Sequence, residues 1–212
     1  MKEFKIRCSA IGKIMGVKGL GKTGESFLQE WLKEQIYQRR KEFSNKYTEK
    51  GLIMEDNSLD YVAEHLDYGM LLKNEEYFEN DFLTGTPDVI LDDHLIDVKN
   101  SWDCFTFPSF YNAVPNKDYY WQAQGYMALT GKSKYKLIYV LMDTPDHLIE
   151  KEFKWNNPNE LEETVFYNKF KYGKIDAKYR IKVFEIERND DDIAKIEERV
   201  NECRNYINQL NK

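Results

Sequence analysis

The segment TGTPDVILDDHLIDVKN, residues 84–100, constrains the fold more than any other part of the chain. Two strand-like runs flank Asp92–Asp93, which predicts a hairpin with these two residues at its turn. In that register Asp88 faces Asp97, and such partners have Cβ atoms about 4.5–5.5 Å apart. A four-residue loop keeps the register, whereas a three-residue loop breaks it. Strand alternation also places Asp97 and Lys99 on one face, so two carboxylates and a lysine converge on one patch.

This patch has two interpretations. It is either a solvated polar face of an exposed hairpin or a site for a divalent cation. Like charges at paired positions are destabilising, and a cation offsets their repulsion. Mg²⁺ takes one or two carboxylates together with waters and phosphate oxygens. A lysine beside such a cation orients or helps to deprotonate an attacking water, or stabilises charge that develops on phosphate.

A third carboxylate lies in the segment KGLIMED, where Glu55 follows Gly51 by four residues. On a helix Glu55 is in line with Leu52, Leu59 and Val62. A carboxylate within an apolar stripe is costly unless it is paired or bound to a metal. Taken alone, Glu55 is equally well a partly exposed surface glutamate.

The segment YYWQAQGYM places Gln122 and Tyr126 four residues apart on one helical face, with Gln124 nearby. Amide and phenol groups are suited to hydrogen bonding with phosphate or with a water near a metal. The alternative is packing at the edge of the core, which the residue types allow equally.

The rest of the chain alternates helical and strand-like patterns without repeats or low-complexity linkers. Residues 9–15 have helical spacing and precede a glycine-rich loop. We expect helices at 25–37, 47–66, 118–129, 161–170 and 190–210, and strands at 85–91, 95–100, 137–142 and 179–187. This order indicates an α/β (α+β) fold, with a mixed sheet flanked by helices in one domain over residues 1–212.

Charge and cysteine content limit the function classes. The net charge of −6 argues at first against nucleic acid as a partner, but residues 1–50 carry +6 and the remainder −12. No apolar run approaches the roughly 20 residues that span a bilayer, and the N-terminus lacks a signal-peptide core. The three cysteines are far apart in the sequence, which fits a reducing cytoplasm. The three histidines are also scattered, so the composition argues against a histidine-rich metal site.

A competing motif is GVKGLGKT, Gly16–Thr23, which satisfies the P-loop pattern and precedes an expected helix. The run LIYVLMD, which ends at Asp143, imitates a Walker B strand. However, a P-loop needs a buried strand directly before its first glycine, and SAIGKIM in that place has helical spacing with Lys13 in the middle. The other interpretation is a flexible basic loop whose Lys18 and Lys22 contact DNA phosphates.

In chain order the motifs are GxxxE at Glu55, PD at Asp88, DxK at 97–99 and QxxxY at 122–126. This order resembles the PD-(D/E)XK nuclease superfamily, and most closely the branch of phage lambda exonuclease, the YqaJ-type viral recombinases and the RecB-like nuclease domains. The resemblance runs from about Arg7 to the last helix and implies a restriction-endonuclease-like core. The second acidic position is Asp rather than the commoner Glu, which the superfamily allows.

The resemblance also implies roles for individual residues in Mg²⁺-dependent cleavage of DNA, with Mn²⁺ as a substitute. The metal-binding residues are Asp88, Asp97 and Glu55, and the catalytic lysine is Lys99. Gln122 or Gln124, together with Tyr126, lies near the active site and the DNA. The expected DNA contacts are made by Arg7, Ser9, Lys13, Lys18, Lys22 and Gln124, with Arg39 and Arg40 as further candidates for the backbone. The four cysteines of the iron–sulfur relatives are missing.

We therefore expect a phage- or prophage-type exonuclease that acts on duplex DNA ends, 5′→3′ by resemblance, in recombination or repair. The expected partners are DNA, a single-strand annealing protein and further copies of the chain in a ring, in the cytoplasm of a bacterial host and without a membrane. The alternatives are an endonuclease or single-strand nuclease of the same superfamily, a P-loop NTPase, and a catalytically silent DNA-binding accessory protein.

Overall fold

The computed structural model describes residues 2–41, 45–156 and 163–211, with helices and strands that alternate along the chain. In chain order the elements are β1 (Ile6–Arg7), the 3₁₀ helix η1 (Cys8–Lys13), α1 (Gly21–Tyr37), α2 (Lys46–His65), β2 (Phe78–Glu79), β3 (Leu83–Gly85), β4 (Val89–Ile90), β5 (Leu95–Asn100), α3 (Lys117–Thr130), β6 (Lys134–Val140), α4 (Asp146–Asn156), α5 (Glu163–Asn168), the 3₁₀ helix η3 (Ala177–Tyr179), β7 (Ile181–Glu187) and α6 (Asp190–Leu210).

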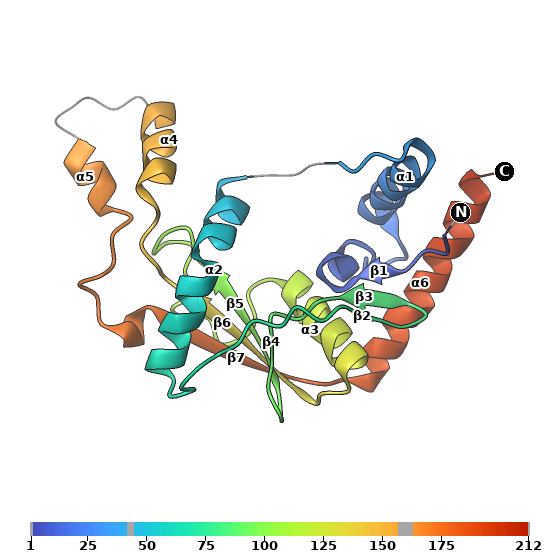
Figure 1. The fold of residues 1–212 in the computed structure, drawn as a ribbon. Coiled ribbons are helices and arrows are strands. Elements are labelled where there is room, and N and C mark those ends of the chain that lie inside the picture. Colours follow the sequence, from blue (N-terminus) through green and yellow to red (C-terminus); the bar gives the residue numbers. More distant parts are fainter. Residues whose placement is uncertain (1, 42–44, 157–162, 212) are drawn as a thin grey trace.

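These strands form two sheets. One has the order β4-β5-β6-β7, with β5 parallel to β6 and the other neighbours antiparallel. The other has the order β1-β3-β2, with β1 parallel to β3. In Figure 1 the helix α1 and the pair α4 and α5 lie at opposite ends of the view, with α2 and α3 between them. The expected α/β class with mixed sheets flanked by helices is confirmed.

The two faces of β5 meet different parts of the protein. Ile96 and Val98 pack with Leu59 and Val62 of α2 in one apolar cluster. Asp97 points the other way, where Gln122 of α3 donates a hydrogen bond to it. This alternation is the expected consequence of the strand period of two. The sheet therefore has an apolar face under α2 and a polar site on the face toward α3.

The hairpin register predicted from the sequence is confirmed. Val89 pairs with Ile96 and Ile90 pairs with Leu95, and the turn lies at residues 92–93. The predicted strand at 85–91 is wrong in one respect, because it is divided between β3 and β4. Pro87 lies at the division, and a proline cannot donate a hydrogen bond to a strand ladder.

The N-terminal region differs from the P-loop hypothesis. Gly16 is preceded by the 3₁₀ helix η1 and not by a buried strand, so the P-loop interpretation of Gly16–Thr23 is not supported. Helix α1 also begins at Gly21, four residues earlier than expected. Gly24 lets α1 lie close to the end of η1, because a Cβ there would lie 3.1 Å from Leu20 Cβ and 3.3 Å from the Lys13 carbonyl oxygen.

The last three α-helices differ in their packing, since α4 and α5 contact each other and α6 contacts α1 and α3. Helix α6 has the predicted bounds and buries one stripe, which consists of Ile193, Ile196, Val200, Cys203 and Ile207. Helix α4 was not predicted. Of the helix expected at 161–170, residues 161–162 lie outside the described residues, α5 covers 163–168, and residues 169–170 form a turn. Within the described ranges, no helix is long and apolar enough to cross a membrane.

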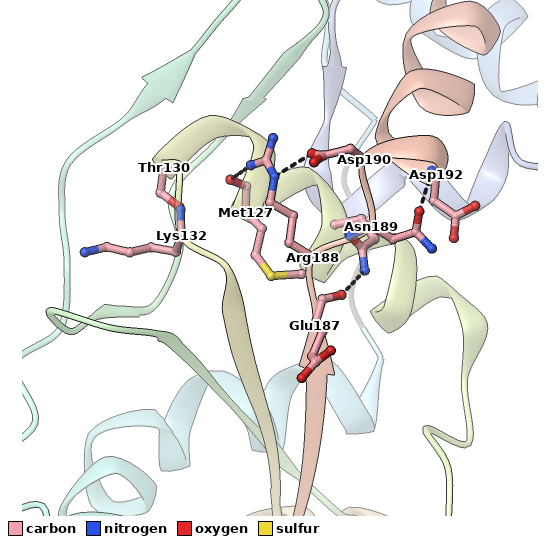
Figure 2. Close-up of polar contacts among 9 residues, drawn as sticks. Met127, Thr130, Lys132, Glu187, Arg188, Asn189, Asp190 and Asp192 are labelled. Atoms are coloured by element: carbon pink, nitrogen blue, oxygen red, sulfur yellow. Dashed lines mark hydrogen bonds and ion pairs between the residues drawn. The ribbon is translucent and has the colours of Figure 1, made fainter.

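The junction between β7 and α6 ties the C-terminal helix to α3 (Figure 2). The Arg188 guanidinium donates to the Met127 carbonyl and forms an ion pair with Asp190 at 2.7 Å. The Asn189 side chain accepts a hydrogen bond from the Asp192 backbone amide and so caps α6. These contacts fix α3, which carries the glutamines of the candidate site, against the C-terminal part of the chain.

Candidate active site

Asp97 is the centre of the polar cluster. It lies on β5, and the residue is 1% exposed. Its Oδ2 atom accepts hydrogen bonds from the Tyr135 hydroxyl at 2.7 Å and from Gln122 Nε2 at 3.1 Å. Its Oδ1 atom lies 2.6 Å from Lys99 Nζ. Burial alone would raise the pKa of Asp97, but the Lys99 charge and the hydrogen bonds from its neighbours hold that pKa below its ordinary value. Asp97 is therefore a buried, charged carboxylate whose two oxygens are contacted by the Tyr135 hydroxyl, the Gln122 amide and the Lys99 ammonium.

Asp88 is the second carboxylate of the cluster and comes directly before β4. Burial, followed by the negative charge of Asp97, raises the pKa of Asp88 from 3.8 to about 8. The neighbouring Lys99 acts in the opposite direction without cancelling the effect. At neutral pH the pair thus holds one proton, which Asp88 shares with Asp97. The hairpin register predicts this close approach of Asp88 and Asp97. Ionising both carboxyl groups at such a short separation is unfavourable.

Lys99 lies on the same face of β5, two residues after Asp97. Burial acts to lower the pKa of Lys99, but the charges of Asp97 and Asp88 outweigh it and raise that pKa to about 12. The ammonium also lies 5.2 Å from the centroid of the Tyr119 ring. Lys99 is therefore a fixed positive charge at the edge of the carboxylate pair.

Helix α3 supplies Gln122 and Tyr126 from one face. The Gln122 amide is nearly buried and spends one of its two N–H donors on Asp97. The Tyr126 ring stacks on Tyr135 with centroids 6.5 Å apart, and burial raises the pKa of its hydroxyl. Gly85 permits this placement, because a Cβ there would lie 2.7 Å from Tyr126 Cε1.

Gln124, the other expected glutamine, faces away from the cluster. Its Nε2 donates to the Glu187 carbonyl at 2.8 Å, and its Oε1 accepts from the Asn189 amide at 2.8 Å. The residue is fully buried. The structure therefore assigns the cluster's glutamine to Gln122, and the buried Gln124 holds the β7–α6 junction and does not offer its amide to DNA.

Glu55 lies on α2 at the margin of the cluster. Its Oε2 atom forms an ion pair with Lys73 Nζ at 2.6 Å. The apolar stripe expected around it is incomplete, since Leu52 is 76% exposed. Both Glu55 and Lys73 act electrostatically on Asp88, so they lie near it. The Asn74 amide donates to the Asp88 carbonyl at 2.7 Å, which explains how the segment with Lys73 reaches the site.

The Asp88–Asp97 pair fits a divalent cation. Among the described residues no three His, Cys, Asp or Glu side chains converge on one point, so Glu55 does not join the pair directly. Mg²⁺ needs only one or two protein carboxylates. Asp97 Oδ1 is buried and, apart from the close approach of Lys99 Nζ, has no aligned hydrogen-bond donor in the described part of the chain. The Asp88–Asp97 carboxylate pair, which shares a proton and lies beside the Lys99 ammonium, is a suitable donor set for Mg²⁺.

The expected DNA-contacting residues of the N-terminal region are exposed, and Arg7 lies beside β3, the strand that leads to Asp88. Arg7 pairs with Thr84 in the ladder between β1 and β3. Lys13 and Lys22 line one shallow pocket on the surface of α1, and Lys13 Nζ lies 5.2 Å from the Phe27 ring centroid. The side chains that point to solvent in this region are those of Arg7, Ser9, Lys13, Lys18 and Lys22, and Arg39 and Arg40 are exposed after α1.

Three contributors to the site were not predicted. Tyr135 donates to Asp97, Tyr119 covers Lys99, and Lys73 pairs with Glu55. Tyr135 lies directly opposite Leu95 on the parallel strand β6, and the predicted strand at 137–142 began too late to include it. Tyr119 belongs to the YYWQAQ segment that drew attention to Gln122. Lys73 lies in an irregular segment without a pattern that could have indicated its position.

Comparison of the fold with solved structures finds exonucleases. A phage-related exonuclease from Haemophilus somnus 129PT matches with a TM-score of 0.80 and 29% identity over 99% of this chain and 96% of that chain. An alkaline exonuclease from Laribacter hongkongensis matches with a TM-score of 0.67 and 17% identity over 98% and 91% of the two chains. Its complex with dAMP gives a TM-score of 0.66 at 18% identity over 97% and 91%. No family model and no curated protein matches the sequence.

The second and third matches establish a shared fold alone, whereas the first also extends the sequence similarity over nearly the whole chain. All three have a mixed α/β architecture that this chain reproduces from β1 to α6. The resemblance that the motifs indicate is confirmed: in its fold this chain is similar to the exonucleases of the lambda exonuclease and YqaJ-like branch.

Proposed function

We propose that this protein is a metal-dependent exonuclease that hydrolyses phosphodiester bonds of DNA. The single observation that carries the proposal is the cluster of Asp88, Asp97, Lys99 and Gln122, within a fold shared with a phage-related exonuclease. A buried and a half-buried carboxylate, a lysine and an amide donor are suited to phosphoryl chemistry, because they can hold a cation and stabilise negative charge on phosphate.

The cofactor that we propose is Mg²⁺, with Mn²⁺ as a substitute. Asp88 and Asp97 would hold it, and Glu55 would assist from α2 once it is released from Lys73. When bound, the cation would supply a nucleophilic water and act as a Lewis acid toward the phosphate. Its positive charge would also replace the proton that the two aspartates share.

The chain's own residues have separate roles in this proposal. Lys99, kept protonated by the two aspartates, stabilises charge on the phosphate and orients the attacking water. Gln122 donates one amide hydrogen to Asp97 and also forms a side-chain hydrogen bond with Tyr126, so it would hold the metal-binding carboxylate in position. Tyr135 and Tyr126 fix the carboxylate and the amide in place, so that little reorganisation is needed when substrate binds.

Exposed cations of the N-terminal region are the DNA-binding residues that we propose. Arg7 lies on β1, Lys13 on η1, Lys18 between η1 and α1, and Lys22 in the first turn of α1, all within the first 50 residues, which carry a net charge of +6. Lysine and arginine contacts to phosphates give affinity without reading sequence. Ser9, on the same exposed segment, would add a hydroxyl hydrogen bond.

Finer properties of the activity follow from the resemblance and from the relatives. We propose action on duplex ends in the 5′→3′ direction, in recombination or repair of phage or prophage type, by one nuclease domain over residues 1–212. A homo-oligomeric ring and a single-strand annealing protein are the partners that this activity implies, in the cytoplasm of a bacterial host. The alternatives are endonuclease or single-strand nuclease activity at the same site, and a silent DNA-binding role.

The experiment that tests this proposal is digestion of end-labelled linear, nicked and closed circular duplex DNA with Mg²⁺ and with EDTA. An exonuclease releases labelled nucleotides from linear DNA, needs the cation and spares closed circles. Cleavage of closed circles would establish an endonuclease instead. DNA binding without cleavage in either Mg²⁺ or Mn²⁺ would leave the silent DNA-binding role.

A further inference from the structure

The loop between β5 and α3, residues 101–116, exposes aromatic side chains next to the candidate active site. Phe105 is 92% exposed, Phe110 is 96% exposed and Tyr111 is 57% exposed. The loop leaves the strand that carries Lys99 and enters the helix that carries Gln122. Both ends of the loop therefore belong to elements of the site, which places the loop within reach of a strand that extends from it.

The loop has a defined shape, so the exposure of the rings is not the result of a loose segment. The Asp103 carboxylate accepts hydrogen bonds from the Phe105 amide at 3.1 Å and from the Thr106 amide at 2.8 Å. Trp102 and Phe107, on either side, are 4% and 6% exposed and anchor the loop in two apolar clusters. The entropy of ordering the backbone is therefore already lost on folding, which favours binding through these rings.

The charge around the rings favours a polyanion. Residues 104–117 contain no aspartate or glutamate, although the chain has 37 acidic residues among 212. The only charged residue in this stretch is Lys117, and Ser109 and Asn112 offer exposed neutral hydrogen-bonding groups. A phosphate backbone lying along residues 104–117 would meet no like charge from that stretch. The carboxylate of the loop, Asp103, accepts hydrogen bonds from the Phe105 and Thr106 amides.

We infer that Phe105, Phe110 and Tyr111 form a stacking surface for the unpaired bases of single-stranded DNA. The inference rests on the proposed function, because the site must handle DNA for such a strand to be present. Unpaired bases offer free faces to aromatic rings, whereas bases within a duplex already stack on their neighbours. Phenylalanine has no hydrogen-bonding group, so the surface would accept every base.

The test compares binding of a fluorescent oligo(dT) with binding of an abasic oligonucleotide of equal length and charge, by fluorescence anisotropy in EDTA. We expect the intact protein to prefer oligo(dT). The double variant Phe105→Ala/Phe110→Ala should lose oligo(dT) affinity by about 10-fold or more, with unchanged affinity for the abasic strand. Phe110→Trp should keep the preference, because a larger ring still stacks.

Tyr179→Ala is the matched control, since Tyr179 is 64% exposed on η3, beside the opposite edge strand β7. It should bind both strands like the intact protein. Equal binding of the two strands by the intact protein, or an unchanged preference in the double variant, would overturn the inference. If the double variant differs from the intact protein in oligomeric mass but keeps the preference for oligo(dT), the inference is also overturned and the rings belong to an interface between copies of the chain.

The same assay separates this inference from the proposed nuclease activity, because it is carried out without a cation. A protein that prefers oligo(dT) through these rings but does not cleave DNA with Mg²⁺ would refute the nuclease alone. A protein that cleaves DNA but keeps its preference in the double variant would refute the stacking surface alone.

Discussion

Replacing Asp88 with Asn is the substitution that probes the carboxylate pair most cleanly. It removes one ionisable group and keeps the side-chain shape. In the intact protein, burial and the Asp97 charge raise the pKa of Asp88 from 3.8 to about 8. Asp88 must therefore give up a proton at alkaline pH in an unfavourable environment, whereas Asn has none to lose.

The sign of the effect follows from linkage. Because the pKa of Asp88 is higher in the folded state than in the unfolded state, its contribution to stability is complete below pH 3.8 and is lost as pH rises to about 8. Each pKa unit corresponds to about 1.4 kcal/mol, so roughly three units between pH 5 and pH 8 give about 4 kcal/mol. Solvent screening of the half-buried Asp88 reduces this, and we expect about 2–3 kcal/mol.

The assay is urea unfolding in EDTA at pH 5 and pH 9, which gives the free energy of unfolding of each protein. The stability of Asp88→Asn relative to the intact protein should grow by about 2–3 kcal/mol between these pH values. Added MgCl₂ should stabilise the intact protein at pH 9 and should have little effect on the variant, because a ligand stabilises only the state that binds it.

Asp93→Asn is the control, because Asp93 lies at the turn of the same hairpin and its pKa is lowered by the hydrogen bond with His94. Its stability relative to the intact protein should not grow with pH. If Asp88→Asn shows the same difference in unfolding free energy at pH 5 and pH 9, the two aspartates do not share a proton and the reasoning is refuted.

Further substitutions test other contacts. Gln122→Leu should slow DNA cleavage per folded molecule by about 100-fold, while Gln124→Leu should lower the unfolding free energy by about 1–3 kcal/mol and preserve the rate per folded molecule. The reverse pattern of cleavage rates would exchange the two roles. Lys50→Met should cost about 2–4 kcal/mol in urea unfolding, because buried Lys50 donates to three backbone carbonyls, and a neutral effect would show that the contacts contribute nothing. Lys73→Ala releases Glu55 and should lower the Mg²⁺ concentration for half-maximal cleavage several-fold, whereas a rise would make Lys73 part of the site.

The sequence predicts the part of the site that local periodicity determines. The alternation over 84–100 gives the register of the hairpin and hence the approach of Asp88 to Asp97. The helical spacing of Gln122 and Tyr126 likewise predicts their shared face. Both results depend on residues close in the chain, where the strand and helix periods act directly.

The remaining features depend on contacts between distant segments. The pairing of β3 with β1 divides the strand expected at 85–91, and no local pattern indicates that partner. Spacing alone did not distinguish Gln122 from Gln124, because both lie on one helix and only the position of β7 shows that Gln124 is occupied. The ion pair of Glu55 with Lys73 could not be predicted either, because Lys73 lies in an irregular segment whose sequence has no helical or strand periodicity.

The most direct test of the central claim is the initial rate of nucleotide release from linear duplex DNA, measured against Mg²⁺ concentration for the intact protein and for Lys99→Met. Methionine keeps the length of the side chain and removes the charge. The account predicts release that depends on Mg²⁺ in the intact protein and a loss of about 100-fold or more in the variant. A variant that cleaves at the rate of the intact protein would contradict the assignment of this cluster as the active site.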